Sequence, residues 1–545
     1  MFDEILNLTK KLVSIKSVNG TSGEKDIGCF IEQYLRNIPY FKEHKDRVIV
    51  SGLKNDKLGR RNVIAVLIGE KEKSDKGILL HGHTDTVDVK DYHNLEKYAF
   101  SSDELMKKLH EIELPLEVKE DLESNDYLFG RGACDMKGGD AVFLVLLKNL
   151  SEKVKDLKGN IVVSFNPVEE NLHTGMIESR EVLEEISDKY KFKYIFAINN
   201  DYICPLYKND TTRYVYTGSV GKILPCFYIM GKETHVGQCF EGVDASLIAS
   251  EIVKKIDLNP EFSEKYNGEY TLPPSVLKIK DLKKEYNVQT SFDSFLYFNY
   301  FIHNKSIIEI MNTLKKATKE SIAEVKSTIN DRYKKYCMLS NTDYSEINFD
   351  SKVLSYEELL KMAEEKYDGN LEEYIDKETE KLLEENLDKR EISLEIVKKL
   401  CSISQIKKVT VVIFFAAPYC PHNTLKSEEE KEEKLYKELS KVIDEFSKET
   451  NEKYKMCQFF PSLSDSSYLK IDDDYESIES LINNFPEYKK IYNLPLKEIK
   501  KFNVPGINFG CFGKDAHKWT ERVYMPYSFN ILPRLILKTL DYFLN

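Results

Sequence analysis

Two short segments carry side chains that are typical of a metal site. Segment 77–87 is an apolar run followed by two histidines and an aspartate, with His81 directly after the apolar residues and His83 two residues later. Segment 130–139, Gly-Arg-Gly-Ala-Cys-Asp-Met-Lys-Gly-Gly, places Asp135 in a turn-rich passage. Imidazole nitrogens and carboxylate oxygens on separate rigid elements are the ligands that zinc-like ions prefer. The two segments therefore predict a metal site that includes His83 and Asp135.

Three more positions extend this pattern. Glu170 and Asp201 each follow an apolar run, 160–165 and 194–198, and His517 lies near the end of the chain. Two histidines and three carboxylates can hold two divalent ions if one carboxylate bridges them, because each ion then keeps an open position for water. A single histidine after a strand is usually structural. The prediction depends on all five positions falling at strand ends or in turns.

Glu169 directly precedes Glu170, and the pair allows a division of roles. One carboxylate can bind metal while its neighbour acts as a general base toward water. The chemistry that these residues predict is hydrolysis assisted by two divalent metal ions. Zinc is the expected metal, and manganese and cobalt stay open because they also tolerate mixed histidine and carboxylate ligands.

The elements that must position these residues alternate along the first part of the chain. Amphipathic helices separate apolar runs that predict strands at 48–50, 62–68, 77–80, 160–165 and 194–198. This alternation predicts an α/β fold with a mixed, largely parallel sheet flanked by helices. Ligands bind such sheets at the carboxyl ends of the strands, which is where the candidate ligands fall.

The pattern changes near residue 216. Strand, helix, strand, strand and helix are predicted in turn at 220–230, 245–256, 276–282, 294–302 and 307–336. This order indicates a small inserted α+β domain. A charged helical tract at 354–408 then predicts a solvated helical face in preference to a docking surface. With the apolar run 409–415 taken as a return to the first pattern, we expect a catalytic domain of 1–215 and 409–545 and an inserted domain of 216–408.

Composition excludes some classes of function. The 545 residues are 41% hydrophobic and 31% charged, as in soluble globular proteins. A net charge of -12 argues against nucleic acid or an anionic membrane surface as a partner, and no apolar stretch approaches the roughly 18 residues of a membrane span. The first 13 residues lack the basic start of a signal peptide, and no two cysteines form a C-x-x-C pair. We expect a cytoplasmic protein.

Four motifs in a fixed order resemble the two-zinc aminoacylase, carboxypeptidase and desuccinylase family of metallopeptidases. The resemblance covers nearly the whole chain. The motifs are H-x-D-T-V at His83, G-R-G-x-x-D-M-K-G-G at Asp135, the pair Glu169-Glu170, and His517-Lys-Trp-Thr-Glu521.

The resemblance implies a ligand for each position of the site. Asp135 would bridge the two ions. His83 and Asp201 would complete one ion's ligands, and Glu170 and His517 those of the other. The family usually has Glu-Pro where this chain has Asp201-Tyr, so Asp201 departs from the pattern.

The resemblance also implies residues that act on substrate. Asp85 would orient His83, and Glu169 would activate water. The inserted domain would be a lid that also carries the subunit contact in dimeric members, so a homodimer is expected. His235 would polarise the scissile carbonyl, and Asn287 would lie near the substrate. A role for His235 as an ordinary surface histidine stays open.

Two expected arginines are missing. The chain has Ser464-Asp465-Ser466-Ser467 where the family has an S-D-A-R-like segment, and Tyr300 where a lid arginine is expected. The guanidinium fork of arginine binds carboxylates through two hydrogen bonds. Without both arginines, we do not expect a simple substrate with a C-terminal amino acid.

The predicted activity is hydrolysis of an amide bond in a small peptide or N-acyl amino acid, linked to arginine or other amino-acid catabolism. Glu169 would pass the proton to the leaving nitrogen, and the metals with His235 would stabilise the oxyanion. Two alternatives stay open. One is a non-hydrolytic, metal-binding regulatory protein on the same fold, although such a protein would not need the base Glu169. The other is a hydrolase of non-peptide amides.

Overall fold

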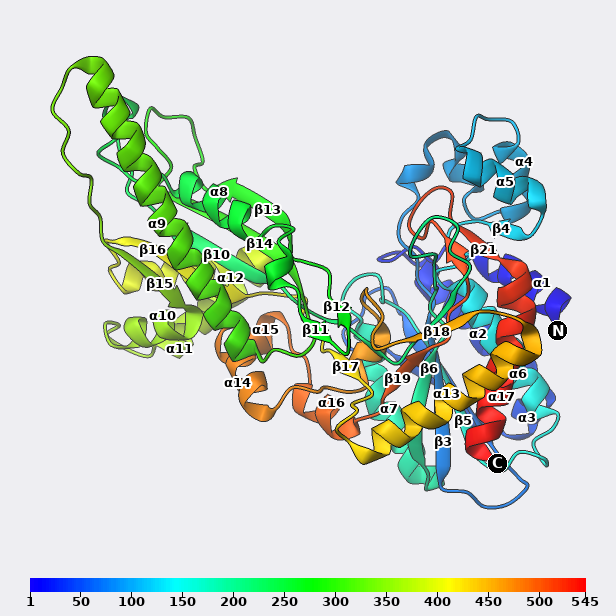
Figure 1. Ribbon diagram of the computed structural model, residues 1–545. Helices are drawn as coiled ribbons and strands as arrows, with labels where there is room; N and C mark the ends of the chain where they lie inside the picture. The colour runs from blue at the N-terminus through cyan, green and yellow to red at the C-terminus, as the bar shows by residue number, and fades with distance from the viewer. The chain divides into compact units, whose positions relative to one another are not determined.

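The structure is a computed structural model that describes residues 1–545 and divides into two compact units. Unit 1 consists of Met1–Ser219, Asn423–Ile471 and Lys497–Asn545, and unit 2 of Val220–His422 and Asp472–Leu496. Each unit is built on its own sheet (Figure 1). No helix in either unit has both the length and the apolar character that crossing a bilayer requires.

Unit 1 contains an eight-stranded sheet in which the central strands are parallel. β3 pairs in parallel with β5 and β6, and β6 with β19, whereas β1 and β2 add antiparallel strands at one side. A mixed, largely parallel α/β fold is therefore confirmed. In spatial order the strands are β1 (Val48–Gly52), β2 (Arg61–Ile68), β5 (Asn160–Asn166), β3 (Lys76–His83), β6 (Lys193–Asn199), β19 (Gly506–Asn508), β7 (Arg213–Tyr216) and β18 (Tyr454–Cys457).

Most helices of unit 1 cover this sheet, whereas α4 and α5 pack against β4 in a separate apolar cluster. α1, α2, α6 and α17 share one apolar cluster with alternate residues of β2, so they lie on one face, and α7 contacts β2 and β5. The helices are α1 (Phe2–Val13), α2 (Gly23–Asn37), α3 (Pro39–Glu43), α4 (Ser102–Leu109), α5 (Leu116–Ser124), α6 (Lys137–Ser151), α7 (Thr174–Tyr190), α13 (Glu430–Thr450), α16 (Leu496–Phe502) and α17 (Leu532–Leu544). Smaller sheets join β4 (Tyr127–Phe129), β21 (Arg522–Tyr524) and β20 (Gly513–Lys514), and β8 (Gly218–Ser219) with β17 (Asn423–Thr424).

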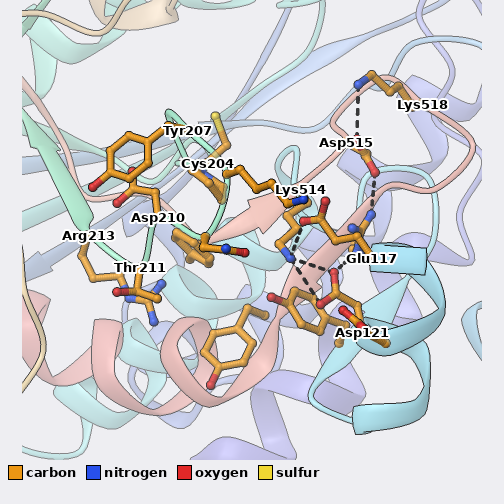
Figure 2. Close-up of a pocket in the computed structure, with 18 residues that line it drawn as sticks. Glu117, Asp121, Cys204, Tyr207, Asp210, Thr211, Arg213, Lys514, Asp515 and Lys518 are labelled. Atoms are coloured by element: carbon orange, nitrogen blue, oxygen red, sulfur yellow. Dashed lines mark hydrogen bonds and ion pairs between the residues drawn. The ribbon is translucent and has the colours of Figure 1, made fainter. Parts of the chain in front are cut away.

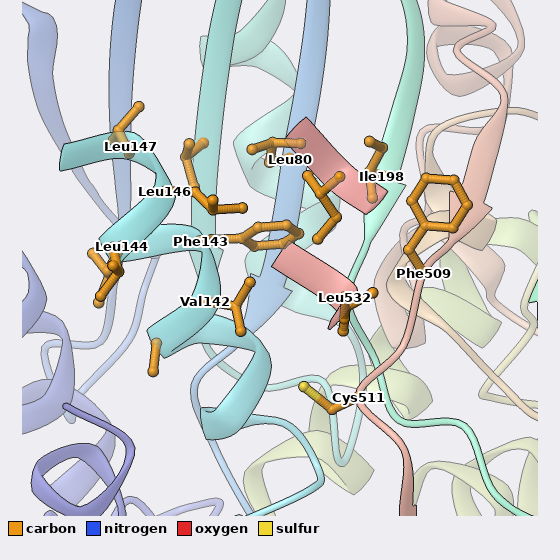
Figure 3. Packing of buried hydrophobic residues seen from close by; sticks show 14 of the residues in the cluster. Leu80, Val142, Phe143, Leu144, Leu146, Leu147, Ile198, Phe509, Cys511 and Leu532 are labelled. Atoms are coloured by element: carbon orange, nitrogen blue, oxygen red, sulfur yellow. The ribbon is translucent and has the colours of Figure 1, made fainter. Parts of the chain in front are cut away.

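The core of unit 1 fixes the strands that carry the candidate ligands. Every residue of β5 and all but the first of β3 are buried, as expected for strands covered on both faces. Figure 3 shows Phe143 and Leu146 projecting from α6 toward Leu80 of β3, with Leu532 of α17 beside them. Burying one such side chain contributes about 1.5–3 kcal/mol, and truncating it to alanine costs about 2–5 kcal/mol. The carboxyl ends of the strands therefore project from a rigid base.

Unit 2 is a six-stranded mixed sheet with helices packed on it. The strands in order are β13 (Ser275–Asp281), β14 (Asp293–Ile302), β10 (Pro225–Met230), β16 (Val409–Phe415) and β15 (Ser351–Ser355), and β9 (Gly221–Ile223) also pairs with β14. The helices are α8 (Ala245–Ile256), α9 (Ile307–Ser340), α10 (Tyr356–Glu364), α11 (Leu371–Glu384), α12 (Lys389–Ile403), α14 (Tyr475–Asn483) and α15 (Tyr488–Ile491). Figure 1 labels the sheet strands β10, β13, β14, β15 and β16 and the seven helices of this unit.

The charged tract 354–408 forms α10, α11 and α12, and it has a buried side as well as a solvated one. Leu359, Leu394 and Leu400 are buried and belong to one cluster with Phe295 and Phe414 of the sheet. The mixed charges therefore mark only the outer face of helices that complete the core of unit 2.

The boundary between the units differs from the expected one at residue 409. β16 pairs antiparallel with β10 and parallel with β15, so it belongs to the sheet of unit 2. The chain returns to unit 1 at Asn423, and 472–496 belong again to unit 2. A seven-residue run in which only Thr410 is polar is typical of a central strand in any covered sheet, so its sequence does not indicate which sheet it joins.

Candidate metal centre

His83 is the last residue of β3, and its two ring nitrogens face different partners. Nδ1 donates to the backbone carbonyl of Asp85 at 3.1 Å, and Nε2 lies 3.0 Å from Oδ1 of Asp135. A carbonyl oxygen can only accept, so it fixes the hydrogen on Nδ1. Nε2 is therefore the nitrogen that can bind an ion.

Asp135 lies in the turn between β4 and α6 and reaches two histidines at once. Its Oδ1 faces Nε2 of His83 at 3.0 Å, and its Oδ2 faces Nε2 of His517 at 3.1 Å. A carboxylate whose two oxygens point to two separate imidazoles has the arrangement of a ligand that bridges two ions. Of the residues predicted from sequence, Asp135 is the centre of the group.

The other predicted ligands complete two groups that share Asp135. Oε1 of Glu170 lies 2.9 Å from Nε2 of His517. The parallel pairing of β3 with β5 and β6 brings the ends of these strands together, which explains the convergence. In each group the possible ligand atoms lie within 4.8 Å of one another, and the groups are His83, Asp135 and Asp201, and Asp135, Glu170 and His517.

The electrostatics of this cluster show an excess of buried negative charge. Burial, reinforced by the charge of Asp135, raises the pKa of Asp201 to about 8, and burial also raises the pKa of Glu170. Burial alone would lower the pKa of His517, but hydrogen bonds to Asp135 and Glu170 raise it to about 11. Without metal ions, the proton on His517 balances part of the negative charge of Asp135 and Glu170. The donor types, the shared carboxylate and the unbalanced charge fit two divalent ions.

Asp85 is buried and organises the turn that follows β5. Its Oδ1 accepts from the backbone N–H of Glu169 at 3.0 Å, and its Oδ2 accepts from that of Glu170 at 3.1 Å. The carboxylate lies 3.9 Å from Nδ1 of His83, so it is the carbonyl of Asp85 that orients the imidazole. Val168 adopts φ 72°, a strained conformation for a β-branched residue, directly before the two glutamates.

Arg131 and Glu521 belong to the motifs seen in the sequence, but their role was missed. Oε1 of Glu521 accepts from the backbone N–H of Asp135 at 3.3 Å and from that of Cys134 at 3.2 Å. Oε2 of Glu521 pairs with the buried Arg131 at 2.9 Å. This pair holds the turn that presents Asp135. The sequence offered a signal for this role, because Arg131 lies in the motif at 130–139 and Glu521 ends the motif that begins at His517.

His173 and Asp465 were also missed, and both are buried beside Glu169. Nδ1 of His173 lies 3.0 Å from Oδ1 of Asp465 and 3.7 Å from Oε1 of Glu169. The spacing of four residues between Glu169 and His173 was a weak signal. Asp465 lies in the segment that matches the family's S-D-A-R-like motif, but no local pattern indicates its contact with His173, which is 292 residues away.

Comparison with known proteins decides the family. Residues 79–478 match Peptidase family M20/M25/M40. The chain belongs to this family.

Two curated relatives of this chain align with it over nearly their full length. The chain is 38% identical to Protein RocB of Bacillus subtilis over 532 residues, which cover 98% of this chain and 93% of that protein. It is 32% identical to the uncharacterized protein YqjN of Bacillus subtilis, with 99% and 96% coverage. The crystal structure of aminopeptidase PepT from Bacillus cereus shares the fold, with a TM-score of 0.53, 12% identity and coverage of 99% and 98%. The expected peptidase family, and with it a hydrolase class, is confirmed.

The M20/M25/M40 match covers four of the five predicted ligands. His83, Asp135, Glu170 and Asp201 lie inside 79–478, and His517 lies beyond it. The structure nevertheless places His517 against Asp135 and Glu170. The fifth position is thus supplied by the carboxyl-terminal part of unit 1.

The two predicted lid residues, His235 and Asn287, lie on neighbouring segments of unit 2. The backbone N–H of Val236 donates to the carbonyl of Val288 at 2.9 Å, and His235 forms a bridge with Gln289. Both side chains are exposed, and each accepts a hydrogen bond from a backbone N–H two residues along the chain. Unit 2 therefore presents His235 and Asn287 together to solvent.

The positions of the two missing arginines are filled by buried side chains. Tyr300 belongs to the core of unit 2, and its hydroxyl donates to the carbonyl of Phe262 at 3.0 Å. Ser467 belongs to the core of unit 1, where it shares a hydrogen bond of 2.9 Å with Ser219. Neither position can offer a charged group to a substrate.

A second charged region of unit 1 is a cavity of about 670 Å³ (Figure 2). Its charged side chains are paired with one another. Lys514 lies 2.8 Å from Glu117 and 2.9 Å from Asp121, and Arg522 lies 2.7 Å from Asp121 and pairs with Asp515. In contrast to the metal centre, this region contains its own counter-charges.

Proposed function

We propose that this protein is a two-metal hydrolase that cleaves an amide bond in a small peptide or an N-acyl amino acid. The observation that carries the proposal is the position of Asp135, whose two carboxylate oxygens face His83 and His517. His83 and Asp201 would hold one divalent ion with Asp135, and Glu170 and His517 the other. Zinc is the proposed metal, with manganese and cobalt as alternatives.

The side chains of the site divide the work of an amide hydrolysis. Two bound divalent ions would supply Lewis acidity and lower the pKa of a water molecule. Glu169 would take the proton of that water and return it to the leaving nitrogen, because burial raises the pKa of its carboxyl well above the usual range and makes proton uptake easy. Asp85 would hold Glu169 and Glu170 in their separate roles through their backbone N–H groups.

The substrate proposal follows from what the site lacks. Tyr300 and Ser467 are buried where arginines were expected, so a substrate that needs a bidentate arginine clamp for a free carboxylate is disfavoured. His235 would polarise the scissile carbonyl and Asn287 would contact the substrate. A homodimer through unit 2, a cytoplasmic location and an arginine-linked substrate remain parts of this proposal.

The first experiment measures hydrolysis by the protein reconstituted with zinc, manganese or cobalt. The panel contains dipeptides and N-acyl amino acids, including arginine derivatives, each with and without a chelator. We expect turnover of at least one class, lost with chelator and restored by added metal. Bound metal without any turnover would favour the alternative of a non-hydrolytic metal-binding protein.

Replacing the base separates chemistry from metal binding. Glu169→Gln should lower kcat by about 10²- to 10⁴-fold, because a positioned general base contributes that much, while metal content stays at the wild-type level. Glu170→Gln is the matched control and should lower metal content. If the two variants behave the other way round, the roles of base and ligand are exchanged.

A further inference from the structure

His173 is a buried histidine that the reaction described above does not use. It precedes α7 directly, and its backbone has φ 55°, in the left-handed region. Its N–H donates to the carbonyl of Val168, which closes the turn that carries Glu169. Non-glycine residues adopt this conformation at a cost, and asparagine tolerates it better than most. The turn thus places an imidazole directly behind the general base.

Asp465 fixes the direction of this imidazole. Its Oδ1 accepts from Nδ1 of His173 at 3.0 Å, and its Oδ2 is buried and has no hydrogen-bond partner. A buried carboxylate with one open oxygen is costly, so the bond to His173 provides most of its compensation. The ring of His173 also packs on Tyr468, with the ring centres 5.0 Å apart.

The segment around Asp465 is itself anchored to the ends of the central strands. The hydroxyl of Ser464 accepts from Nδ2 of Asn199 at 3.0 Å, and the hydroxyl of Ser466 lies 3.0 Å from Nε2 of His81. Since Asn199 ends β6 and His81 lies near the end of β3, Asp465 is positioned by the same strands that present the metal centre.

Nδ1 of His173 faces two carboxylates at once. It lies 3.0 Å from Asp465 and 3.7 Å from Oε1 of Glu169. The longer distance is outside hydrogen-bond range, but a proton-bearing nitrogen at this distance still attracts a carboxylate oxygen, and more strongly inside a protein than in water. An oxygen of Glu169 is therefore drawn toward a nitrogen whose position Asp465 sets.

We propose that His173 and Asp465 form a positioning pair for Glu169, in which Asp465 accepts the Nδ1–H of His173 and fixes the imidazole, and the electropositive Nδ1 edge of that ring, 3.7 Å from Oε1 of Glu169, orients the carboxylate of the general base. This inference rests on the proposed function of Glu169. It assigns to this chain's Asp465 a role inside the site, at the segment that lacks the expected arginine.

The pair keeps its protons while Glu169 exchanges one. In the first step, Glu169 takes a proton from water as the new bond to the carbonyl carbon forms. In the second step, that proton passes to the nitrogen as the carbon–nitrogen bond breaks. Glu169 ends as it began, and the N–H of His173 stays on Nδ1. The pair acts through the orientation of Glu169 and touches neither substrate nor metal.

Kinetics of matched variants test this role. His173→Gly removes the side chain without strain at positive φ and should lower kcat by about 10- to 100-fold, with KM and metal content unchanged within twofold. His173→Asn places an amide donor near the position of Nδ1 and should restore most of kcat. Asn171→Ala, at an exposed position in the same turn, is the control and should be neutral.

A double variant shows whether His173 acts through Glu169. In a Glu169→Gln background, His173→Gly should cause no further loss of kcat, because the group that it positions is gone. Additive losses, a parallel loss of metal, or a His173→Asn variant as slow as His173→Gly would overturn the proposal.

A spectroscopic measurement tests the pair even without turnover. In metal-loaded protein labelled with ¹⁵N-histidine, the signals of His173 are assigned by their absence in His173→Asn. We expect a protonated Nδ1 whose proton signal moves in Asp465→Asn and also in Glu169→Gln. An unprotonated Nδ1, or a proton signal that stays unchanged in both variants, would overturn the proposed positioning pair. If no substrate is cleaved but these shifts occur, the proposed function fails and the pair stands.

Discussion

Unit 1 contains two clusters of charged side chains that differ in one respect. The cavity near α5 is lined by five acidic and five basic side chains, and its central lysine and arginine pair with acids inside the cavity. The metal centre gathers four carboxylates, those of Asp135, Glu169, Glu170 and Asp201, with the imidazoles of His83 and His517 among them and that of His173 behind Glu169. The cavity neutralises itself, and the centre does not.

This difference appears in the pKa values of the two regions. In the cavity, the hydrogen bond to Lys514 lowers the pKa of Glu117, as in an ordinary ion pair. In the centre, burial and repulsion from Asp135 raise the pKa of Asp201 to about 8. Both regions are rich in charged side chains, so the number of charges does not distinguish them. Buried negative charge without a cationic partner is what marks a site for metal ions.

The largest effect is expected from the residue that the two ions would share. Asp135→Asn should remove metal from both positions, because each group loses its common oxygen donor. Metal ions contribute several kcal/mol to the transition state, so we expect turnover to fall by at least about 1,000-fold. Metal content by mass spectrometry and kcat/KM check this. Two bound ions per chain in Asp135→Asn would contradict the difference described between the metal centre and the cavity.

A smaller effect is expected from a ligand that serves one ion. Asp201→Asn should lower metal content from two ions to one and turnover by about 10- to 100-fold, a loss typical of a damaged metal site. The count of ions distinguishes this variant from Asp135→Asn. Unchanged stoichiometry and activity would show that the ligands of this ion are assigned wrongly.

The cavity supplies the matched control. Asp121→Asn removes a carboxylate that pairs with Lys514 and Arg522. We expect a loss of about 1–3 kcal/mol in the free energy of unfolding, because charge-assisted hydrogen bonds are weakened, with metal content and kcat/KM within twofold of wild type. Denaturant unfolding and metal analysis measure the two quantities. A loss of metal equal to that of Asp135→Asn would show that the two regions do not differ as described.

The last prediction concerns a pH dependence at His81, two residues before His83. Burial, with the charge of His83, lowers the pKa of His81 to about 3 from its usual 6.5. Between these pH values the unfolded chain binds a proton that the folded chain does not, so stability is lost as pH falls through this window. In metal-free protein, the wild type should lose stability relative to His81→Gln by up to about 1.4 kcal/mol per pH unit below pH 6.5. Parallel stability curves would contradict the pKa shift.

Local sequence patterns were sufficient for much of the fold and part of the site. Apolar runs gave the central strands, and parallel pairing then brought His83, Glu170 and Asp201 to one edge of the sheet. The position of β16 could not be predicted, because a fully buried, almost entirely apolar strand fits either sheet.

Long-range contacts set the limit of that prediction. His517 is 347 residues from Glu170, and its residue type made it a candidate ligand, but no local pattern showed which residues it would contact. The contacts of Glu521 with the turn of Asp135, and of Asp465 with His173, connect segments about as far apart and have no local periodicity. Such contacts depend on tertiary packing, which a pattern of neighbouring residues does not encode.

The most direct test of the account is the number of metal ions bound per chain. Wild-type protein is stripped with a chelator, dialysed to equilibrium against zinc, manganese or cobalt, and analysed together with Asp121→Asn. We expect about two ions per chain of at least one of these metals in both proteins. A wild-type protein that binds no ion under any of these conditions would contradict the central claim, because its excess of buried carboxylates would then have to be balanced by protons alone.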